Sequence, residues 1–191
     1  MRHINMTALD DIYYVRLVKN GDANAFVYIV RRYQRMIFSI VNRIIVNEVD
    51  AEDITQEIFI KVYSSIAKFR EESEFSTWLY RIAYNTAISE ARKIKREFTS
   101  IDDWLENRPE NELSDEIEEV DSETRMRYLE MVLKGMSPED VLLISLYYMD
   151  NRSVKDISEI TGFSGSNVKV KLYRIRKYMN MEINKLLFDG K

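Results

Sequence analysis

The sequence contains no cysteine, two prolines and five glycines among its 191 residues. Without cysteine, the chain cannot form disulfide bonds, thiolate metal sites or a cysteine nucleophile, which fits a reducing compartment. An average chain of this length would carry roughly 23 glycines and prolines. Because β-sandwiches and barrels need many turn residues, this shortage argues against an all-β fold and favours long helices.

Long apolar runs are also missing. The longest apolar stretch lies near residues 141–149, far short of the ~20 residues that span a bilayer, and the first six residues lack the apolar run of a signal peptide. Hydrophobic residues nevertheless make up 46% of the chain, which suffices for a core and excludes wholesale disorder. We therefore expect a soluble, cytoplasmic, all-α protein without membrane insertion.

The groups that support catalysis are scarce. The five glycines are scattered and form no phosphate-binding loop, and His3 is the only histidine. A carboxylate-bridged metal site in a helical bundle would need Glu-x-x-His pairs. We therefore expect no catalytic residues, no metal ion and no other cofactor, and an enzyme is the weakest hypothesis for this chain.

Charge is segregated along the chain, although the formal net charge is only −4. Residues 99–123 contain eleven acids and one base, a formal charge of −10, whereas residues 1–98 and 124–191 carry +2 and +4. A run of like charge resists compaction. The pattern predicts two small helical domains, residues 1–98 and 124–191, joined by an acidic linker over 99–123. The linker is either a solvating spacer or a mobile mimic of nucleic acid.

Apolar residues of the first domain recur with the 3.6-residue period of amphipathic helices. This period predicts a helix over residues 26–45, preceded by a stop and N-cap at Gly21-Asp22. A second helix should begin near Asp50, and a third after Phe75, capped by Ser76 or Thr77. The predicted buried stripe of the second helix comprises Ile54, Ile58, Val62, Ser65 or Ile66, and Phe69.

The face opposite this stripe combines polar residues with one apolar residue. Asp53, Gln56, Glu57 and Ile60 share it on a helical wheel. A single exposed apolar residue is common and often has no function. With its acidic rim, Ile60 is alternatively the centre of a contact patch.

The third predicted helix ends in a basic cluster of four cations within five residues: Arg92, Lys93, Lys95 and Arg96. Cations complement the dipole at a helix C-terminus, but four exceed what a cap requires. Compact basic clusters also neutralise phosphates, so these residues are candidates for nucleic-acid binding. Neighbouring aromatic residues either stack on unpaired bases or belong to the core.

The second domain carries the signals of a helix-turn-helix. Helix starts are predicted at Ser137-Pro138 and at Ser153 with Asp156. Gly162 predicts a stop, and residues 164–167 open the last helix. The buried stripe of that helix should comprise Val168, Leu172, Ile175 and Met179.

The last helix carries five cations and no acid between residues 164 and 179. Such a face is either an ordinary solvated surface or, as the missing acids favour, a DNA-reading helix. A conventional helix-turn-helix regulator would need a two-fold interface and palindromic half-sites, which two unlike domains fit poorly. The candidate DNA-binding residues are Ser166, Asn167, Lys169, Val170, Tyr173, Arg174 and Lys177, with Lys171 nearer the buried stripe.

Three segments, in this order, resemble the sigma-70 family of bacterial RNA polymerase subunits. Residues 50–63 (DAEDITQEIFIKVY) resemble its region 2.2. Residues 75–87 (FSTWLYRIAYNTA) resemble region 2.3 of the extracytoplasmic-function (ECF) branch, and residues 162–177 (GFSGSNVKVKLYRIRK) resemble region 4.2. The resemblance implies a sigma factor that binds the β and β′ subunits of core RNA polymerase and directs promoter-specific initiation.

The resemblance also implies roles for the candidate residues. The face with Ile60 would bind the coiled coil of β′, and an anti-sigma factor is a further expected partner. A pocket of Ser65, Phe69 and Asn85 would hold a base flipped from the −10 element, and the cations of residues 92–96 would hold its phosphates. The eight candidates of the last helix, Lys171 included, would read the −35 element, and the linker would thread the channel that later holds RNA.

Overall fold

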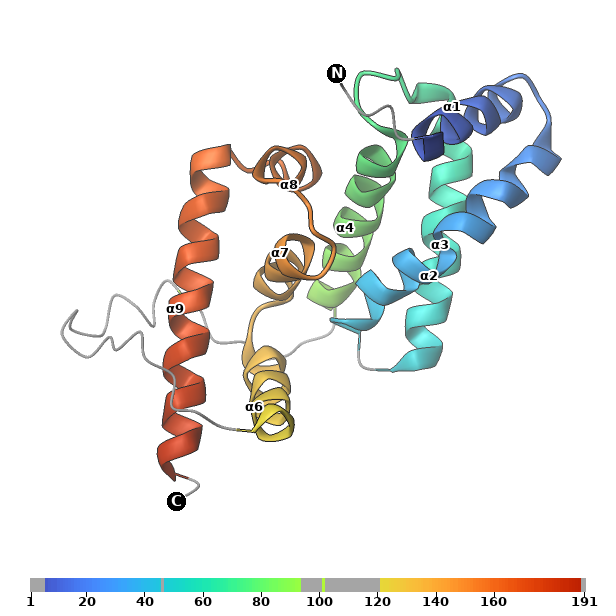
Figure 1. The fold of residues 1–191 in the computed structure, drawn as a ribbon. Helices are drawn as coiled ribbons and strands as arrows, with labels where there is room; N and C mark the ends of the chain where they lie inside the picture. The colour runs from blue at the N-terminus through green and yellow to red at the C-terminus, as the bar shows by residue number, and fades with distance from the viewer. Residues whose placement is uncertain (1–5, 46, 94–100, 102–120, 190–191) are drawn as a thin grey trace. The chain divides into compact units, whose positions relative to one another are not determined.

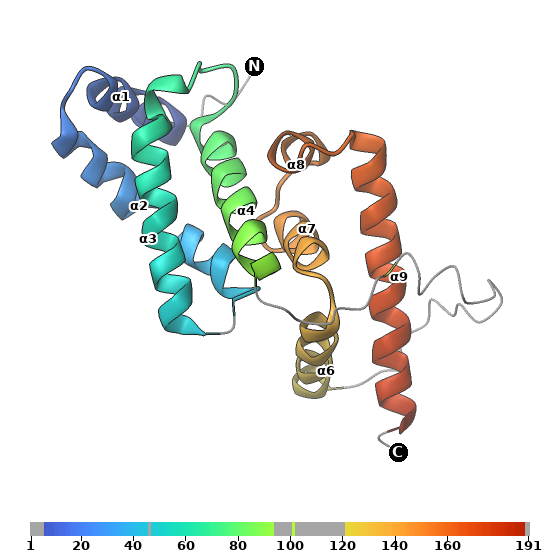
Figure 2. The same cartoon turned by 180° about the vertical axis from the view of Figure 1, so that it is seen from behind.

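The computed structural model describes residues 6–45, 47–93, 101 and 121–189. These residues form α-helices and two short 3-10 helices, with no extended strand among them (Figure 1). The all-α prediction is thereby confirmed. The helices belong to two compact units, one containing α1–α4 and the other containing α6, α7 and α9 (Figure 2).

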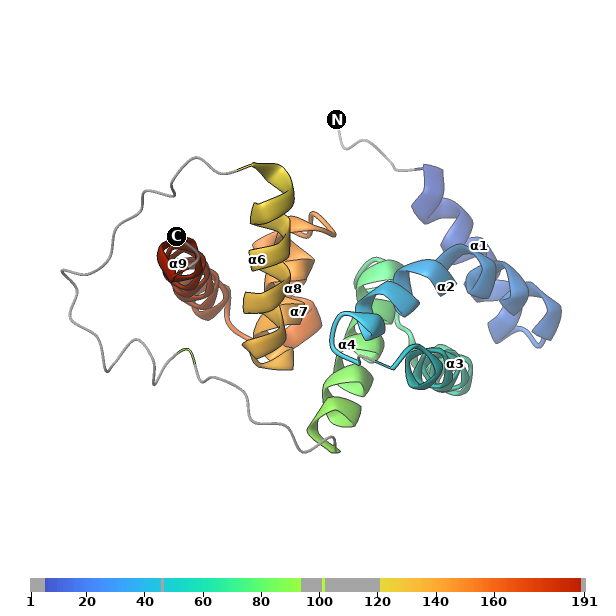
Figure 3. The same ribbon diagram turned by 90° about the horizontal axis from the view of Figure 1, so that it is seen from below.

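The first unit is a bundle in which α2 contacts α1, α3 and α4 (Figure 3). Side chains from all four helices are fully buried in its core, among them Val15, Ile29, Ile58 and Leu79. The bounds of its elements are α1 (Met6–Lys19), η1 (Ala23–Ala25), α2 (Phe26–Asn42), α3 (Glu48–Ser65), η2 (Ile66–Lys68) and α4 (Phe75–Lys93).

Helix α1 was not predicted, whereas the stop at Gly21 is confirmed, and Asp22 caps η1 rather than α2. Gly21 adopts a φ of 97°, a left-handed conformation that favours glycine. The Asp22 carboxylate then accepts hydrogen bonds from the backbone N–H groups of Asn24 and Ala25, at 3.0 and 3.3 Å. The chain therefore turns sharply after α1 and enters α2.

The predicted start of α3 is wrong by two residues. The Asn47 side chain accepts hydrogen bonds from the N–H groups of Val49 (3.0 Å) and Asp50 (3.5 Å), so Asn47 is the N-cap. Its extended backbone is the conformation that an N-cap requires. Asp50 instead lies in the first turn, where its negative charge complements the helix dipole.

The predicted cap of α4 is also wrong. The helix begins at Phe75, and the Glu74 carbonyl accepts from the N–H of Trp78 at 3.2 Å. Ser76 and Thr77 therefore lie inside the first turn. The Ser76 hydroxyl lies 3.3 Å from Glu74 Oε2, to which it donates a hydrogen bond, and Thr77 is buried.

The predicted buried stripe of the second helix is largely confirmed. Ile58, Val62, Ile66 and Phe69 are buried, whereas Ile54 and Ser65 are half-buried. Because α3 ends at Ser65, the 3-10 helix η2 and the residue after it carry the last part of this stripe.

Helix α6 of the second unit begins two residues before residue 124, where the second domain is predicted to start. Helix α6 starts at Ser122, and Asp121 is its N-cap, with a carboxylate 2.8 Å from the N–H of Thr124. Residues 102–120 of the predicted linker, and Lys95 and Arg96 before it, lie outside the described residues. The helices that follow the predicted linker have the bounds α6 (Ser122–Gly135), α7 (Pro138–Tyr148), α8 (Val154–Thr161) and α9 (Gly165–Asp189).

The helix-turn-helix is confirmed in α8 and α9. The Ser153 N–H donates to the Asp156 carboxylate and the Asp156 N–H donates to the Ser153 hydroxyl, both at 3.1 Å, which is a capping box. Gly162 follows α8 with a φ of 81°. The Ser164 hydroxyl then accepts from the N–H of Asn167 at 3.2 Å and caps α9.

Helix α9 packs against α6 and α7. Its predicted stripe of Val168, Leu172 and Ile175 is buried, and Met179 is half-buried. The predicted start of α7 is also confirmed, because the Ser137 hydroxyl accepts from the Asp140 N–H at 3.2 Å.

Candidate polymerase and DNA interfaces

Helix α3 presents an exposed stripe along its length. Ile60 is 68% exposed and Asp53 and Gln56 are exposed, as predicted. Two further apolar residues extend the stripe, Val49 near the start (65% exposed) and Tyr63 near the end (46%). The members of this α3 stripe are Val49, Asp53, Gln56, Ile60 and Tyr63. Their alternating spacing of four and three residues places them on one face of the helix.

The edges of the α3 stripe are held by neighbouring side chains. The Tyr63 ring lies edge-on to Phe26 of α2, with centroids 5.0 Å apart. Glu57 is half-buried and pairs with Lys61 one turn later, at 2.7 Å. Glu57 therefore lies at the border of the α3 stripe, to which Ile60 belongs.

An aromatic cluster joins the segment after η2 to the first turn of α4. The Phe69 ring lies 5.5 Å from that of Phe75 and 5.3 Å from that of Trp78, measured between centroids. Phe69 is buried by these contacts. Its ring is therefore part of the core of the first unit.

The three residues of the predicted base pocket occupy different positions. Ser65 is half-buried at the end of α3, and its hydroxyl donates to the Lys61 carbonyl at 2.5 Å. Asn85 is exposed on α4, about two turns beyond the Trp78 that contacts Phe69. The structure thus places Phe69 at the N-terminal end of α4 and Asn85 near its middle.

Two of the four predicted phosphate-binding cations are described. Arg92 and Lys93 are exposed in the last turn of α4. A hydrogen bond to Glu90, at 2.7 Å, raises the pKa of the Lys93 ammonium group. Lys93 therefore remains charged at neutral pH.

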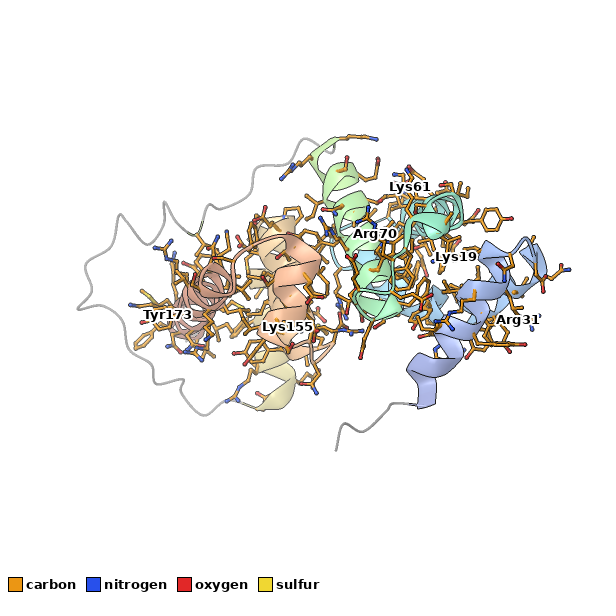
Figure 4. All side chains as sticks on the ribbon, turned by 90° about the horizontal axis from the view of Figure 1, so that it is seen from above. Lys19, Arg31, Lys61, Arg70, Lys155 and Tyr173 are labelled. Carbon is orange, nitrogen blue, oxygen red and sulfur yellow. The ribbon has the colours of Figure 1, made fainter. Side chains whose placement is uncertain are left out.

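The N-terminal half of α9 exposes most of the predicted DNA-binding residues. Tyr173 is 54% exposed on this helix (Figure 4), with the Arg176 and Lys177 charges 5.9 and 5.7 Å from its ring centroid. Lys177 is half-buried. The exposed candidates are Ser166, Asn167, Lys169, Val170, Tyr173 and Arg174. With five cations and no acid over residues 164–179, this half of α9 presents a positive face, and the major groove admits an α-helix.

Lys171 differs from the other candidates. Its ammonium nitrogen lies 3.7 Å from Glu139 Oε1 on α7 and 5.3 Å from the Phe163 ring centroid. The side chain is half-buried between these groups. Lys171 therefore links α9 to α7, which leaves its charge less available to DNA than that of Lys169.

Sequence reasoning missed a set of contacts between α1 and the segment after η2. Arg16 forms two hydrogen bonds with the Glu71 carboxylate, and Lys19 donates to the Phe69 carbonyl. The spacing of Asp11, Val15 and Val18 could have revealed α1, because these buried residues follow a helical period. The contacts themselves join residues about 50 positions apart and have no local signal.

The described residues contain neither a candidate metal site nor a candidate membrane-spanning helix. No group of three or more His, Cys, Asp and Glu side chains in them could hold a metal ion. No helix in the same part of the chain has the length and apolar character needed to cross a membrane.

Both units match known protein families. Residues 29–97, which include most of α2 and all of α3 and α4, match the family described as Sigma-70 region 2. Residues 126–179, from α6 into α9, match the family described as Sigma-70, region 4.

Solved structures share the fold at low sequence identity. The structure of CnrH in complex with the cytosolic domain of CnrY is 18% identical, with a TM-score of 0.66, and the match covers 95% of this chain and 99% of that one. The sigma factor RpoE of Bartonella quintana, in complex with the anti-sigma factor NepR, is 21% identical, with a TM-score of 0.57 and coverage of 82% and 95%.

Curated relatives resemble the chain over nearly its whole length. The ECF RNA polymerase sigma-E factor of Haemophilus influenzae is 35% identical over 94% of this chain and 98% of its own length. The ECF RNA polymerase sigma factor SigW of Bacillus subtilis is 31% identical over 90% and 96%. This chain therefore belongs to the ECF branch of the sigma-70 family of RNA polymerase sigma factors.

Proposed function

We propose that this chain binds core RNA polymerase and directs initiation at promoters that carry matching −35 and −10 elements. The observation that carries the proposal is that one chain combines an exposed apolar stripe on α3 with an acid-free basic face on α9. The first suits a protein partner and the second suits DNA. Neither the proposed recognition nor the recruitment requires a catalytic residue, metal or cofactor in this chain.

The α3 stripe binds the coiled coil of the β′ subunit. Ile60 supplies the apolar centre, and Asp53, Gln56 and Glu57 surround it. Burying an apolar residue inside a polar rim is the usual arrangement of an interface hot spot. The four-three spacing of the stripe lets it interdigitate with helices of the coiled coil.

The first unit also recognises the −10 element as an unpaired strand. A flipped base contacts Ser65 and Asn85, while the buried Phe69 supports this site from the core, and Arg92 and Lys93, together with Lys95 and Arg96, neutralise the neighbouring phosphates. Flipping costs a few kcal/mol of stacking, so a fitted site selects the sequence while it melts the duplex. The exposure of Asn85, Arg92 and Lys93 supports this role.

The N-terminal half of α9 reads the −35 element in the major groove. Lys169, Tyr173 and Arg174 reach base edges or phosphates, and Ser166, Asn167 and Lys177 flank them. Val170 offers only apolar contact, for example with a thymine methyl group. Lys171 contributes least, because Glu139 competes for its charge.

The remaining parts of the proposal concern regulation and organisation. Residues 1–98 and 124–191 act as separate domains, and the acidic linker occupies the RNA channel until transcription displaces it. The two solved structures are complexes, one of CnrH with the cytosolic domain of CnrY and one of the sigma factor RpoE with the anti-sigma factor NepR. We infer that an anti-sigma factor also restrains this chain, and that it acts in the cytoplasm, where core polymerase is found.

A gel-shift experiment separates a sigma factor from a conventional regulator. The probes are labelled genomic fragments, mixed with the purified chain alone, with core polymerase alone, or with both. A sequence-specific complex that needs both proteins supports the proposal. Tight, specific binding by the chain alone would instead identify a regulator that acts without polymerase.

A further inference from the structure

The segment between η2 and α4 is held by α1 through an ion pair. Arg16 Nη2 lies 2.6 Å from Glu71 Oε2, and Arg16 Nε lies 3.2 Å from Glu71 Oε1. These hydrogen bonds raise the pKa of Arg16 and lower that of Glu71, so both groups are charged at neutral pH. A bidentate pair fixes direction as well as distance.

A second contact lies one helical turn further along α1. The Lys19 ammonium nitrogen donates to the Phe69 carbonyl at 2.5 Å and lies 5.5 Å from the centroid of the Phe69 ring. Arg16 and Lys19 are three residues apart, on one face of the helix. Together they hold residues 69 and 71, and we call this arrangement the α1 clamp.

The segment between η2 and α4 contains a residue whose backbone conformation is unfavourable for its residue type. Glu71 has a φ of 60°, a left-handed conformation that non-glycine residues rarely adopt. Other contacts must therefore maintain this conformation. The bidentate pair with Arg16 is such a contact, because it ties the strained residue directly to α1.

Helix α1 is itself anchored to α2, so the clamp has a rigid base. The buried Asp11 carboxylate accepts from the Tyr33 hydroxyl at 2.5 Å and lies 3.2 Å from Arg32 Nε. Val15 and Val18 are buried on the same helix. Displacement of the clamp would require these contacts to move with it.

We propose that Arg16 and Lys19 are positioning residues that set selectivity for the −10 element by fixing the segment that carries Phe69. The inference rests on the proposed function, in which Phe69 helps to form the base pocket. A pocket discriminates between bases only if its groups are held in place, since small displacements weaken oriented contacts. The clamp itself does not touch DNA in this proposal.

A purely stabilising role is the weaker explanation. Arg16 is 64% exposed at its side chain, and exposed ion pairs contribute little to global stability. Loss of the pair should therefore leave the fold intact and alter only the held segment. This difference makes selectivity, rather than stability, the informative measurement.

The test uses holoenzyme assembled from the full chain and core polymerase. The probes are a promoter found by run-off transcription of genomic fragments and versions of it with each −10 base replaced. The measured quantity is the ratio of initiation rates on the original and replaced promoters, for wild type, Arg16→Gln and Lys19→Met. Arg31→Gln is the matched control, because Arg31 is an exposed arginine of α2, away from the clamp (Figure 4).

We expect Arg16→Gln and Lys19→Met to lower this ratio roughly three- to tenfold at one or two −10 positions. This reduction is smaller than the full loss of affinity that one mismatched base pair can cause. Selectivity for the −35 element and competition for core polymerase should not change. The exchange Arg16→Glu with Glu71→Arg should restore the ratio. Because each ratio compares promoters within one preparation, a reduced active fraction does not alter it.

An unchanged ratio in Arg16→Gln, or an equal loss in Arg31→Gln, would overturn the clamp while leaving the proposed function intact. An exchange variant as unselective as Arg16→Gln would overturn the role of the ion pair. If wild type initiates on no fragment, the proposed function fails, and the clamp proposal falls with it.

Discussion

Single residues that connect helices shape the first unit, and the buried carboxylate of Asp11 is the clearest case. It accepts a hydrogen bond from Tyr33 and lies beside Arg32, so its charge is paired away from water. Burial and the hydrogen bond to Asp11 raise the pKa of the Tyr33 hydroxyl above that of a free tyrosine. A buried charge that loses a partner destabilises the fold.

Tyr33→Phe should therefore lower the free energy of unfolding by about 1.5–3 kcal/mol, the range for a hydrogen bond to a charged group. Urea unfolding at neutral pH measures this loss. Tyr13→Phe is the control, because Tyr13 is exposed on the same pair of helices. A loss of equal size in both variants would contradict the role assigned to the Asp11 network.

The same network predicts a pH dependence. The folded-state pKa of Tyr33 is raised above its unfolded-state value of about 10. Its contribution to the free energy of unfolding is therefore complete below about pH 10 and declines as pH rises above that value. Wild type should therefore lose stability relative to Tyr33→Phe above about pH 10. A constant difference between the two proteins across that range would count against the assignment.

At the scale of the element, α3 and α9 expose the faces that their sequences predict. Helical periodicity placed Ile60 opposite Ile58 and Val62, and the structure confirms this arrangement. The prediction succeeded because each of these helices buries one strongly apolar stripe, which determines where its other residues face.

Ile60→Lys should weaken binding to core polymerase by about 2 kcal/mol, roughly thirtyfold, because the substitution places a charge at a hot-spot position. Competition with a labelled sigma factor for core polymerase gives the affinity, and circular dichroism checks helicity. Tyr13→Lys makes the same change of charge at an exposed residue of α1. A loss of helicity in Ile60→Lys would mean that Ile60 belongs to the core.

Arg174→Ala should weaken promoter binding by holoenzyme by about 1–3 kcal/mol, the cost of losing one arginine contact to DNA. Filter binding of holoenzyme to a DNA fragment with the −35 element measures this change in binding free energy. The affinity for core polymerase should not change. Lys185→Ala, which also removes an exposed cation from α9, is the control. Equal losses in promoter binding and core binding would argue against −35 recognition.

The cap of α6 gives a further prediction. A hydrogen bond from the Thr124 N–H lowers the pKa of Asp121, so its stabilising effect is present at neutral pH and disappears as pH falls through that lowered pKa. Asp121→Ala should lower the melting temperature at pH 7 and differ little from wild type well below pH ~3.9, the unperturbed value. Glu130→Ala is the control, because it removes an exposed acid from the same helix without removing a cap.

Sequence reasoning failed where several residues compete for one role. Helix α3 begins at Glu48, two residues before the predicted start near Asp50, with Asn47 as its N-cap, and α4 begins before Ser76 and Thr77. Any of these side chains can cap a helix, and the backbone conformation selects among them. Helix α1 was missed although the apolar spacing around Val15 is helical.

At the scale of the whole molecule, contacts between distant segments were beyond prediction. The Arg16–Glu71 pair joins residues 55 positions apart, and Lys171 turns toward Glu139 on another helix. No local pattern specifies such pairs, because they depend on how the helices pack. The order of the two units and the family resemblance, in contrast, followed from the sequence alone and are confirmed by the matches to sigma-70 regions 2 and 4.

The central claim is that this chain determines where core polymerase begins RNA synthesis. Run-off transcription of genomic fragments, with purified core polymerase and with or without the chain, tests it most directly. We expect discrete transcripts from a few start sites, preceded by shared −35 and −10 sequences, only when the chain is present. The same transcripts without the chain, or none with it under conditions where it binds core polymerase, would contradict the claim.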